Sequence, residues 1–74
     1  MELTKNEFRI LNLLMQSKGS IVSRETIMRR LWEDESFVDD NTLTVNMTRI
    51  RKKLDDLGKS RFITTIKGEG YMIK

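Results

Sequence analysis

The apolar residues between positions 43 and 57 recur at helical spacing, and this pattern constrains the fold more than any other feature of the sequence. At ~100° of rotation per residue they fall on one narrow stripe, formed by Leu43, Met47, Ile50, Leu54 and Leu57. The chain has 74 residues and no cysteine, so no disulfide supplements its core. The sequence therefore predicts a single domain, residues 1–74, whose other elements pack against this helix.

The opposite side of the same helix is polar and basic, with one exception. Val45 lies roughly 200° from Leu43, near the centre of that side. The other residues expected on or beside this face are Thr42, Asn46, Thr48, Arg49, Arg51, Lys52 and Lys53. Single exposed apolar residues are common and need no special explanation. The position of Val45 is therefore either incidental or a sign that the face makes an apolar contact.

Two shorter helices are predicted before this one. Thr4 and Glu7 form a capping box for the first helix, Leu3 and Phe8 suit a hydrophobic staple, and Gly19 ends it. Its apolar positions are Phe8, Ile10, Leu11, Leu13, Leu14 and Met15. Ser23 suits the N-cap of the second helix, whose core face is expected to hold Ile27, Met28, Leu31 and Trp32.

The third helix is expected to begin near Asn41, with Asp39 or Asp40 as its N-cap, and to end at Leu57 before Gly58. After it, residues 62–66 and 71–73 read as the arms of a β-hairpin. Gly68 and Gly70 lie in its turn, where a positive φ is expected. The segment 21–22 could supply a third strand. This order predicts an α+β fold, a winged helix-turn-helix of three helices with a small antiparallel sheet and a C-terminal β-hairpin wing.

The net charge of +3 is unevenly distributed along the chain. Residues 1–40 hold six Lys/Arg against eight Asp/Glu, whereas residues 41–74 hold eight against three. A solvated basic face would explain the second half, but a split this sharp in a short chain favours a polyanionic partner.

Enzymatic activity is not expected from this composition. The chain has neither histidine nor cysteine, and its paired carboxylates are adjacent residues that point about 100° apart on a helix. The "KGEG" turn lacks the length, the Lys-Ser/Thr pair and the following helix of a phosphate-binding loop. No metal or other cofactor is expected. No apolar run approaches the ~20 residues of a membrane span, and no signal peptide is present, so a soluble, cytoplasmic module is expected.

The residue types on the basic face are those that read DNA in the major groove. Arginine donates two hydrogen bonds to guanine, asparagine pairs with adenine, and small apolar groups contact the thymine methyl. Arg51 and Lys53 at its flanks suit phosphates. In the hairpin, Lys67 can reach a minor groove or the backbone, and Thr64, Thr65 and Tyr71 could donate to phosphates. Tyr71 could equally be a half-buried strand residue.

Four runs carry a family resemblance: "LTKNEFRILNLL", "SRETIMRRLW", "VDDNTLTVNMTRIRKKL" and "ITTIKGEGYMI". Together they closely resemble the effector domain of OmpR/PhoB-type response regulators over nearly the whole chain. The resemblance implies double-stranded DNA as partner, with the third helix in the major groove and the wing on the minor groove. By position it implies contacts from Thr42, Val45, Asn46, Arg49, Arg51, Thr65, Lys67 and Tyr71. The run "FVDDNTLTVN" resembles a subgroup associated with cell-envelope and antimicrobial-peptide stress.

The chain departs from the family pattern in two places. Family effector domains begin with a four-stranded sheet, of which only Glu2–Leu3 could be a remnant, and their wing tip often carries Arg where this chain has Lys67. The phosphorylated receiver domain is absent from this chain. The resemblance implies a cognate receiver domain in the full-length protein, a monomer in isolation and a dimer on DNA.

The acidic loop before the third helix is either a solvated connector or a protein contact. The resemblance implies that RNA polymerase is contacted there, through Glu33, Asp34, Glu35, Ser36, Phe37 and Asp39. Phe37 either tucks against Trp32, which is favoured, or anchors the partner. The alternative function is a winged helix that binds protein rather than DNA. Such domains lack a basic recognition face, so the basic residues after Thr48 favour DNA.

Overall fold

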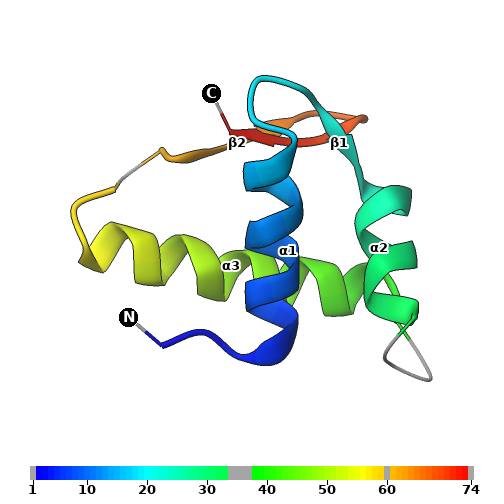
Figure 1. The fold of residues 1–74 in the computed structure, drawn as a ribbon, viewed down its shortest axis with the longest axis horizontal. Helices are drawn as coiled ribbons and strands as arrows, with labels where there is room; N and C mark the ends of the chain where they lie inside the picture. The colour runs from blue at the N-terminus through cyan, green and yellow to red at the C-terminus, as the bar shows by residue number, and fades with distance from the viewer. Residues whose placement is uncertain (1, 34–37, 60, 74) are drawn as a thin grey trace.

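The computed structural model describes residues 2–33, 38–59 and 61–73. Its elements in chain order are α1 (Lys5–Gln16), β1 (Val22–Ser23), α2 (Arg24–Trp32), α3 (Asp40–Asp56), β2 (Ile63–Ile66) and β3 (Gly70–Ile73). Helix α3 runs across the molecule behind α1, and the sheet lies at the end where α1 leads into β1 (Figure 1). The predicted fold class is confirmed. None of the helices in these ranges is long and apolar enough to cross a membrane.

Each helix begins at a side chain that accepts a hydrogen bond from a free backbone N–H. Thr4 Oγ1 accepts from Glu7 N (3.2 Å) and Glu7 Oε1 accepts from Thr4 N (3.0 Å), which completes the capping box. Ser23 Oγ accepts from Thr26 N at 3.1 Å. Asp39 Oδ1 accepts from Thr42 N at 2.8 Å. The predicted caps are confirmed, and Asp39 rather than Asp40 caps α3.

The C-terminal end of α3 is a Schellman motif. Lys59 N donates to Leu54 O (2.8 Å) and Gly58 N donates to Asp55 O (2.9 Å), while Gly58 takes the positive φ of 77° that this motif requires. Helix α1 ends earlier than predicted, with Ser17 as its C-cap. Gly19, at φ 87°, instead donates its N–H to Ile73 O at 2.7 Å and ties the turn after α1 to the sheet.

The sheet is antiparallel in the order β1-β3-β2, so the hairpin gains a third strand from the segment before α2. In its register Tyr71 pairs with Val22 on one side and with Thr65 on the other. Gly68 has the expected positive φ of 77°, but the reason predicted for Gly70 is wrong. A Cβ on Gly70 would lie 2.0 Å from Val22 O, so this glycine is required by the close approach of β1.

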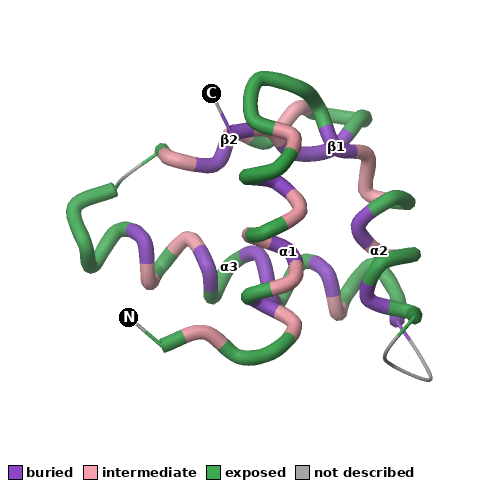
Figure 2. Tube along the Cα trace, in the orientation of Figure 1, coloured by how far each residue is buried: buried purple, intermediate pink, exposed green. Residues whose placement is uncertain are grey.

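The core lies between the three helices and one face of the sheet. In α3 buried positions alternate with exposed ones turn by turn (Figure 2), as the predicted stripe requires. The buried hydrophobic residues are Ile10, Leu14, Val22, Ile27, Leu31, Val38, Leu43, Met47, Ile50, Leu54, Ile63, Tyr71 and Ile73.

Four residues predicted to pack in the core are exposed instead. The exposed fractions are 58% for Phe8, 48% for Met15, 54% for Trp32 and 54% for Leu57. On α2 the buried residues are Ile27 and Leu31, which lie about 40° apart, and Met28 packs against them half-buried. Trp32 lies ~100° beyond Leu31. On α1 the core takes the side of Ile10 and Leu14, which turns Phe8 and Met15 outward. Leu57 follows the last helical residue as the C-cap. The predicted apolar faces were too wide.

Candidate nucleic-acid interface

The outer face of α3, defined here as Val45, Thr48, Arg49 and Lys52, is exposed along its length. Val45 is 38% exposed, which confirms its predicted position away from the core stripe. Among the described residues, the side chains of Arg49 and Lys52 form no hydrogen bond or ion pair. Their charges are therefore available to an outside partner.

The threonine hydroxyls on this side of α3 donate within the protein. Thr48 Oγ1 donates to Thr44 O at 2.9 Å, and Thr44 Oγ1 donates to Asp40 O at 3.0 Å. Thr42 Oγ1 donates to Asp39 Oδ1 at 2.9 Å. These oxygens can still accept a hydrogen bond, but their single protons are already used.

The prediction that Asn46 lies on the exposed face is wrong. Asn46 is only 7% exposed, and its Nδ2 donates to Thr42 O at 2.8 Å. It follows Leu43 by three positions and precedes Met47, so it lies at the edge of the buried stripe. The side chain is therefore largely covered, and one of its amide protons is donated within its own helix.

Lys53 was predicted to flank the face and suit phosphates, but its ammonium group points to α1. Its Nζ donates to Oε1 of Glu7, a carboxylate that is fully buried. Burial raises the pKa of Glu7, but the hydrogen bonds from Lys53 and from the Thr4 amide, with the charge of Arg49, outweigh burial and lower it overall. This ion pair joins α1 to α3.

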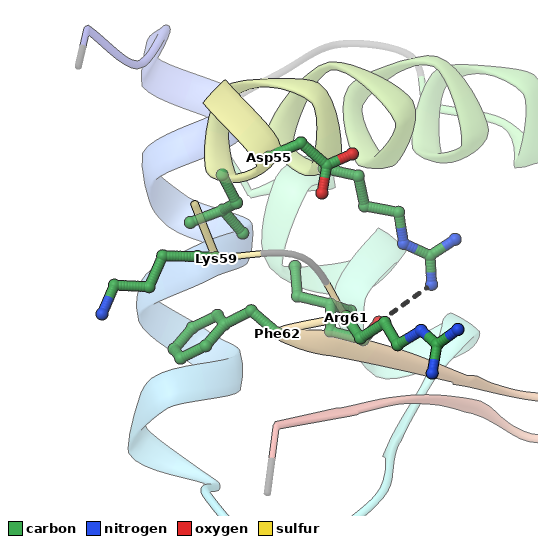
Figure 3. A pocket seen from close by; sticks show the side chains of 7 residues that line it. Asp55, Lys59, Arg61 and Phe62 are labelled. Carbon is green, nitrogen blue, oxygen red and sulfur yellow. Dashed lines mark hydrogen bonds between the residues drawn. The ribbon is translucent and has the colours of Figure 1, made fainter. Parts of the chain in front are cut away.

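Arg51 was also predicted to contact phosphate, and it lies against the wing instead. Its Nη2 donates to Thr65 Oγ1 and to Ile63 O at 3.4 Å, the bond drawn dashed in Figure 3. Its guanidinium carbon lies 5.7 Å from the centre of the Tyr71 ring, within cation–π range. Arg51 thus connects α3 to both strands of the hairpin.

Tyr71 is 5% exposed, so it is a strand residue as one alternative predicted, but it is buried rather than half-buried. Arg24 Nη1 donates to its hydroxyl at 2.9 Å, and the Arg24 guanidinium carbon lies 5.9 Å from the ring centre. Arg24 also pairs with Asp40 Oδ1 at 3.2 Å. Helices α2 and α3 are thus joined to the hairpin by four side chains, those of Arg24, Arg51, Thr65 and Tyr71.

The turn of the wing presents Lys67 to solvent. Glu69 N donates to Ile66 O at 2.9 Å and closes the turn, and Gly68 supplies its positive φ. Lys67 is therefore held at the tip of the hairpin, as the sequence predicted.

The acidic loop is described only at its two ends. Asp34, Glu35, Ser36 and Phe37 lie outside the described residues, and so does the expected contact between Phe37 and Trp32. Glu33 is exposed where α2 ends. Asp39 is engaged as the N-cap, and the Thr42 amide and hydroxyl lower its pKa. One acidic residue of this loop therefore has a structural role.

A hollow of about 280 Å³ lies between the end of α3 and the start of β2. Of its three cationic residues, Lys59 and Arg61 point to opposite sides (Figure 3), and Arg51 donates to Ile63 O. Asp55 and Phe62 occupy other parts of the wall. This arrangement does not assemble an anion site.

Two side-chain contacts between segments far apart in the sequence were not predicted. Glu7 and Lys53 are 46 positions apart, and Arg24 and Tyr71 are 47 apart. Glu7 was recognised for its capping role alone. The available signal was its place in α1, because Glu7 lies on the same side as Ile10 and Leu14.

Three helices followed by a β-hairpin that is clamped to the longest helix define a winged-helix domain. The chain belongs to the family of C-terminal domains of transcriptional regulatory proteins, whose model matches residues 1–73.

Curated relatives and solved structures agree with this membership. The chain is 58% identical over 73 residues to the sensory transduction protein BceR of Bacillus subtilis (strain 168); the match covers 99% of this chain and 32% of that protein. The chain thus spans about a third of the length of such relatives. The C-terminal domain of the nisin resistance regulator NsrR, a lantibiotic response regulator, has a TM-score of 0.86 at 42% identity, covering 99% of this chain and 74% of that one.

A further solved relative was determined as a complex with DNA. The DNA-binding domain of Klebsiella pneumoniae RstA, in complex with the RstA box, has a TM-score of 0.77 at 26% identity. The match covers 97% of this chain and 72% of that one.

Proposed function

We propose that the domain binds double-stranded DNA sequence-specifically and serves as the output domain of a two-component response regulator that controls transcription. The observation that carries the proposal is the outer face of α3, where Arg49 and Lys52 are exposed beside Val45 and form no hydrogen bond or ion pair with the part of the chain that the structure describes. Membership of a family of transcriptional regulators supports it, as does the Klebsiella relative solved with its DNA box.

In this proposal α3 enters the major groove and the wing lies over the adjacent minor groove or the backbone. Arg49 reads a guanine through two hydrogen bonds. Lys52 and Lys67 neutralise phosphates, from α3 and from the wing tip. Val45 contacts a thymine methyl group.

The side chains that are engaged inside the protein have a different role. Arg51 holds the wing at a fixed distance from α3 through Thr65 and the Tyr71 ring. Lys53 holds α3 on α1 through Glu7. Both are positioning residues, since the groove contacts of helix and wing require a fixed geometry between the two.

Retention on a DNA column separates this function from the protein-binding alternative. Binding through phosphates falls steeply with salt, by about 0.9 in log K per log unit of salt for each phosphate contact. Selection of bound duplexes from a random pool should yield one sequence pattern, and Arg49→Ala should relax it at one position. Lys18→Ala, on the turn after α1, is the matched control and should leave the pattern unchanged. Retention that is indifferent to salt, with no pattern selected, would favour the protein-binding module.

Further partners follow from the same proposal. The acidic loop from Glu33 to Asp39 is proposed to contact RNA polymerase, and a receiver domain is proposed to belong to the full-length cytoplasmic protein. The domain alone is proposed to be a monomer that dimerises on DNA. Sedimentation tests the last point directly: one copy without DNA and two on a selected site are expected, and a dimer without DNA would contradict it.

A further inference from the structure

We propose that the outer side of α3 reads DNA through methyl groups as well as through Arg49, so that the preferred site contains a short run of thymines. Thr42, Val45 and Thr48, called the methyl ridge below, form this reading surface. The inference rests on the proposed function, since it names the kind of sequence that the same helix selects.

The methyl ridge is a row inclined to the axis of the helix. Its members are three positions apart, so Thr42 and Thr48 lie about 60° to either side of Val45. The six steps from Thr42 to Thr48, at a rise of 1.5 Å each, span about 9 Å along the helix axis. Base pairs stack every ~3.4 Å along a strand, so the ridge is long enough to meet roughly three of them.

Hydrogen bonding inside α3 decides which atoms the two threonines present. The Thr48 hydroxyl donates to Thr44 O at 2.9 Å, and the Thr42 hydroxyl donates to Asp39 Oδ1 at 2.9 Å. A Cβ whose hydroxyl is directed to the protein leaves its methyl group for the solvent side. The ridge therefore offers the side chain of Val45, 38% exposed, between the methyl groups of exposed Thr48 and half-buried Thr42.

The polar groups that could compete for the same bases are few. The Asn46 side chain is 7% exposed and donates one amide proton to Thr42 O, so the proposal assigns it no base. Among the four residues of the outer face, only Arg49 and Lys52 retain unengaged donors. Apolar contact with the C5-methyl of thymine is the readout that remains for the ridge.

Two conservative substitutions of Thr48 show whether its methyl group or its hydroxyl group contacts the base, because they change DNA affinity in opposite ways. Thr48→Val keeps the methyl and removes the hydroxyl, whereas Thr48→Ser keeps the hydroxyl and removes the methyl. If the hydroxyl oxygen accepted a hydrogen bond from a base amine, Thr48→Ser would preserve binding and Thr48→Val would lose it. If the methyl makes the contact, the order is reversed.

The experiment begins with duplexes that the 74-residue chain selects from a random pool, measured by fluorescence anisotropy at fixed salt. Replacing each thymine of the selected site by uracil removes one methyl group and leaves base pairing intact. We expect affinity to fall about fourfold for each contacted methyl, the equivalent of one buried carbon. Thr48→Ser should lower affinity by a similar factor on the thymine site and have no effect once the matching uracil is present.

Controls keep the result specific. Thr26→Ser removes a methyl from an exposed threonine of α2 and should change nothing, and uracil outside the run should be neutral. Full affinity on a uracil-substituted site, or binding kept by Thr48→Ser and lost by Thr48→Val, would overturn the methyl ridge while DNA binding stood. Failure to bind any duplex in a salt-dependent way would instead overturn the proposed function.

Discussion

Two pairs of cations within five positions of α3 have different surroundings. Arg49 and Lys52 are exposed and unengaged among the described residues, whereas Arg51 donates to the wing and Lys53 to Glu7. Lys52 and Lys53 are even adjacent in sequence. The comparison shows that neighbouring cations on one helix can have different surroundings, so closeness in sequence does not imply a shared role.

The geometry of the helix explains the difference. Arg49 and Lys52 lie within about 60° of each other, centred on the side away from the core. Lys53 lies about 100° beyond Lys52, towards α1, and Arg51 lies 100° to the other side, towards the sheet. Arg51 and Lys53 therefore flank the outer face, and they hold the wing and α1, respectively, against α3.

The largest expected effect is on the free energy of unfolding, and it should differ between the buried side of α3 and its outer face. Ile50→Ala removes a side chain that is 0% exposed, and it should lower the free energy of unfolding by about 2–5 kcal/mol. Val45→Ala should cost less than about 1 kcal/mol, since a residue opposite the core leaves no cavity. Urea unfolding of the two variants checks this. Equal losses would mean that Val45 belongs to the core.

Base readout by Arg49 should give the next largest effect. Arg49→Ala should weaken binding to the best site by about 1–3 kcal/mol and relax the preference at a single base pair. Arg51→Met is the comparison: it should weaken binding without relaxing that preference, since the guanidinium is directed to the wing. Affinities on a panel of single-base variants measure both. If the base preference were relaxed in Arg51→Met and kept in Arg49→Ala, Arg51 would be the residue that reads the base, and Arg49 would not.

The sequence predicted the elements well and the individual partners poorly. Caps at Thr4, Ser23 and Asp39 are local hydrogen bonds, so sequence alone located the helix starts closely. Trp32 and Asn46 were misplaced because the width of a buried helix face depends on which neighbours cover it. The ion pair of Glu7 with Lys53 joins distant segments, and no local pattern marks it.

Acid should weaken the link between α1 and α3 before it affects the outer face. The pKa of Glu7 is lowered from 4.5 in the folded protein, so its contribution is fully present above that value and is lost as pH falls through the folded pKa. Glu7→Gln should cost about 1 kcal/mol at pH 7, because Lys53 is 33% exposed and solvent screens the pair.

The unfolding free energy as a function of pH is the measurement. The gap between Glu7→Gln and the unsubstituted chain should narrow below pH ~4.5. Asp39 is a second group whose pKa is lowered, so Asp39→Asn should show the same trend and serves as the reference. A gap that stayed constant down to acid pH would show that the ion pair does not stabilise the fold.

The wing tip should give the smallest effect. Lys67→Ala removes an exposed charge and should weaken all sequences alike, by less than about 1 kcal/mol at physiological salt. The selected sequence pattern should not change. Competition assays with specific and random duplexes test this, and a change in base preference would show that Lys67 reads sequence.

The most direct measurement compares the adjacent lysines by the salt dependence of binding to one selected duplex. Lys52→Ala should reduce the slope of log K against log salt by about 0.9, the value for one phosphate contact, and leave the thermal midpoint unchanged. Lys53→Met should keep the slope and lower the midpoint, because it breaks the contact with Glu7. Equal reductions in slope, with both midpoints unchanged, would contradict the division between outward cations that bind DNA and flanking cations that hold the fold.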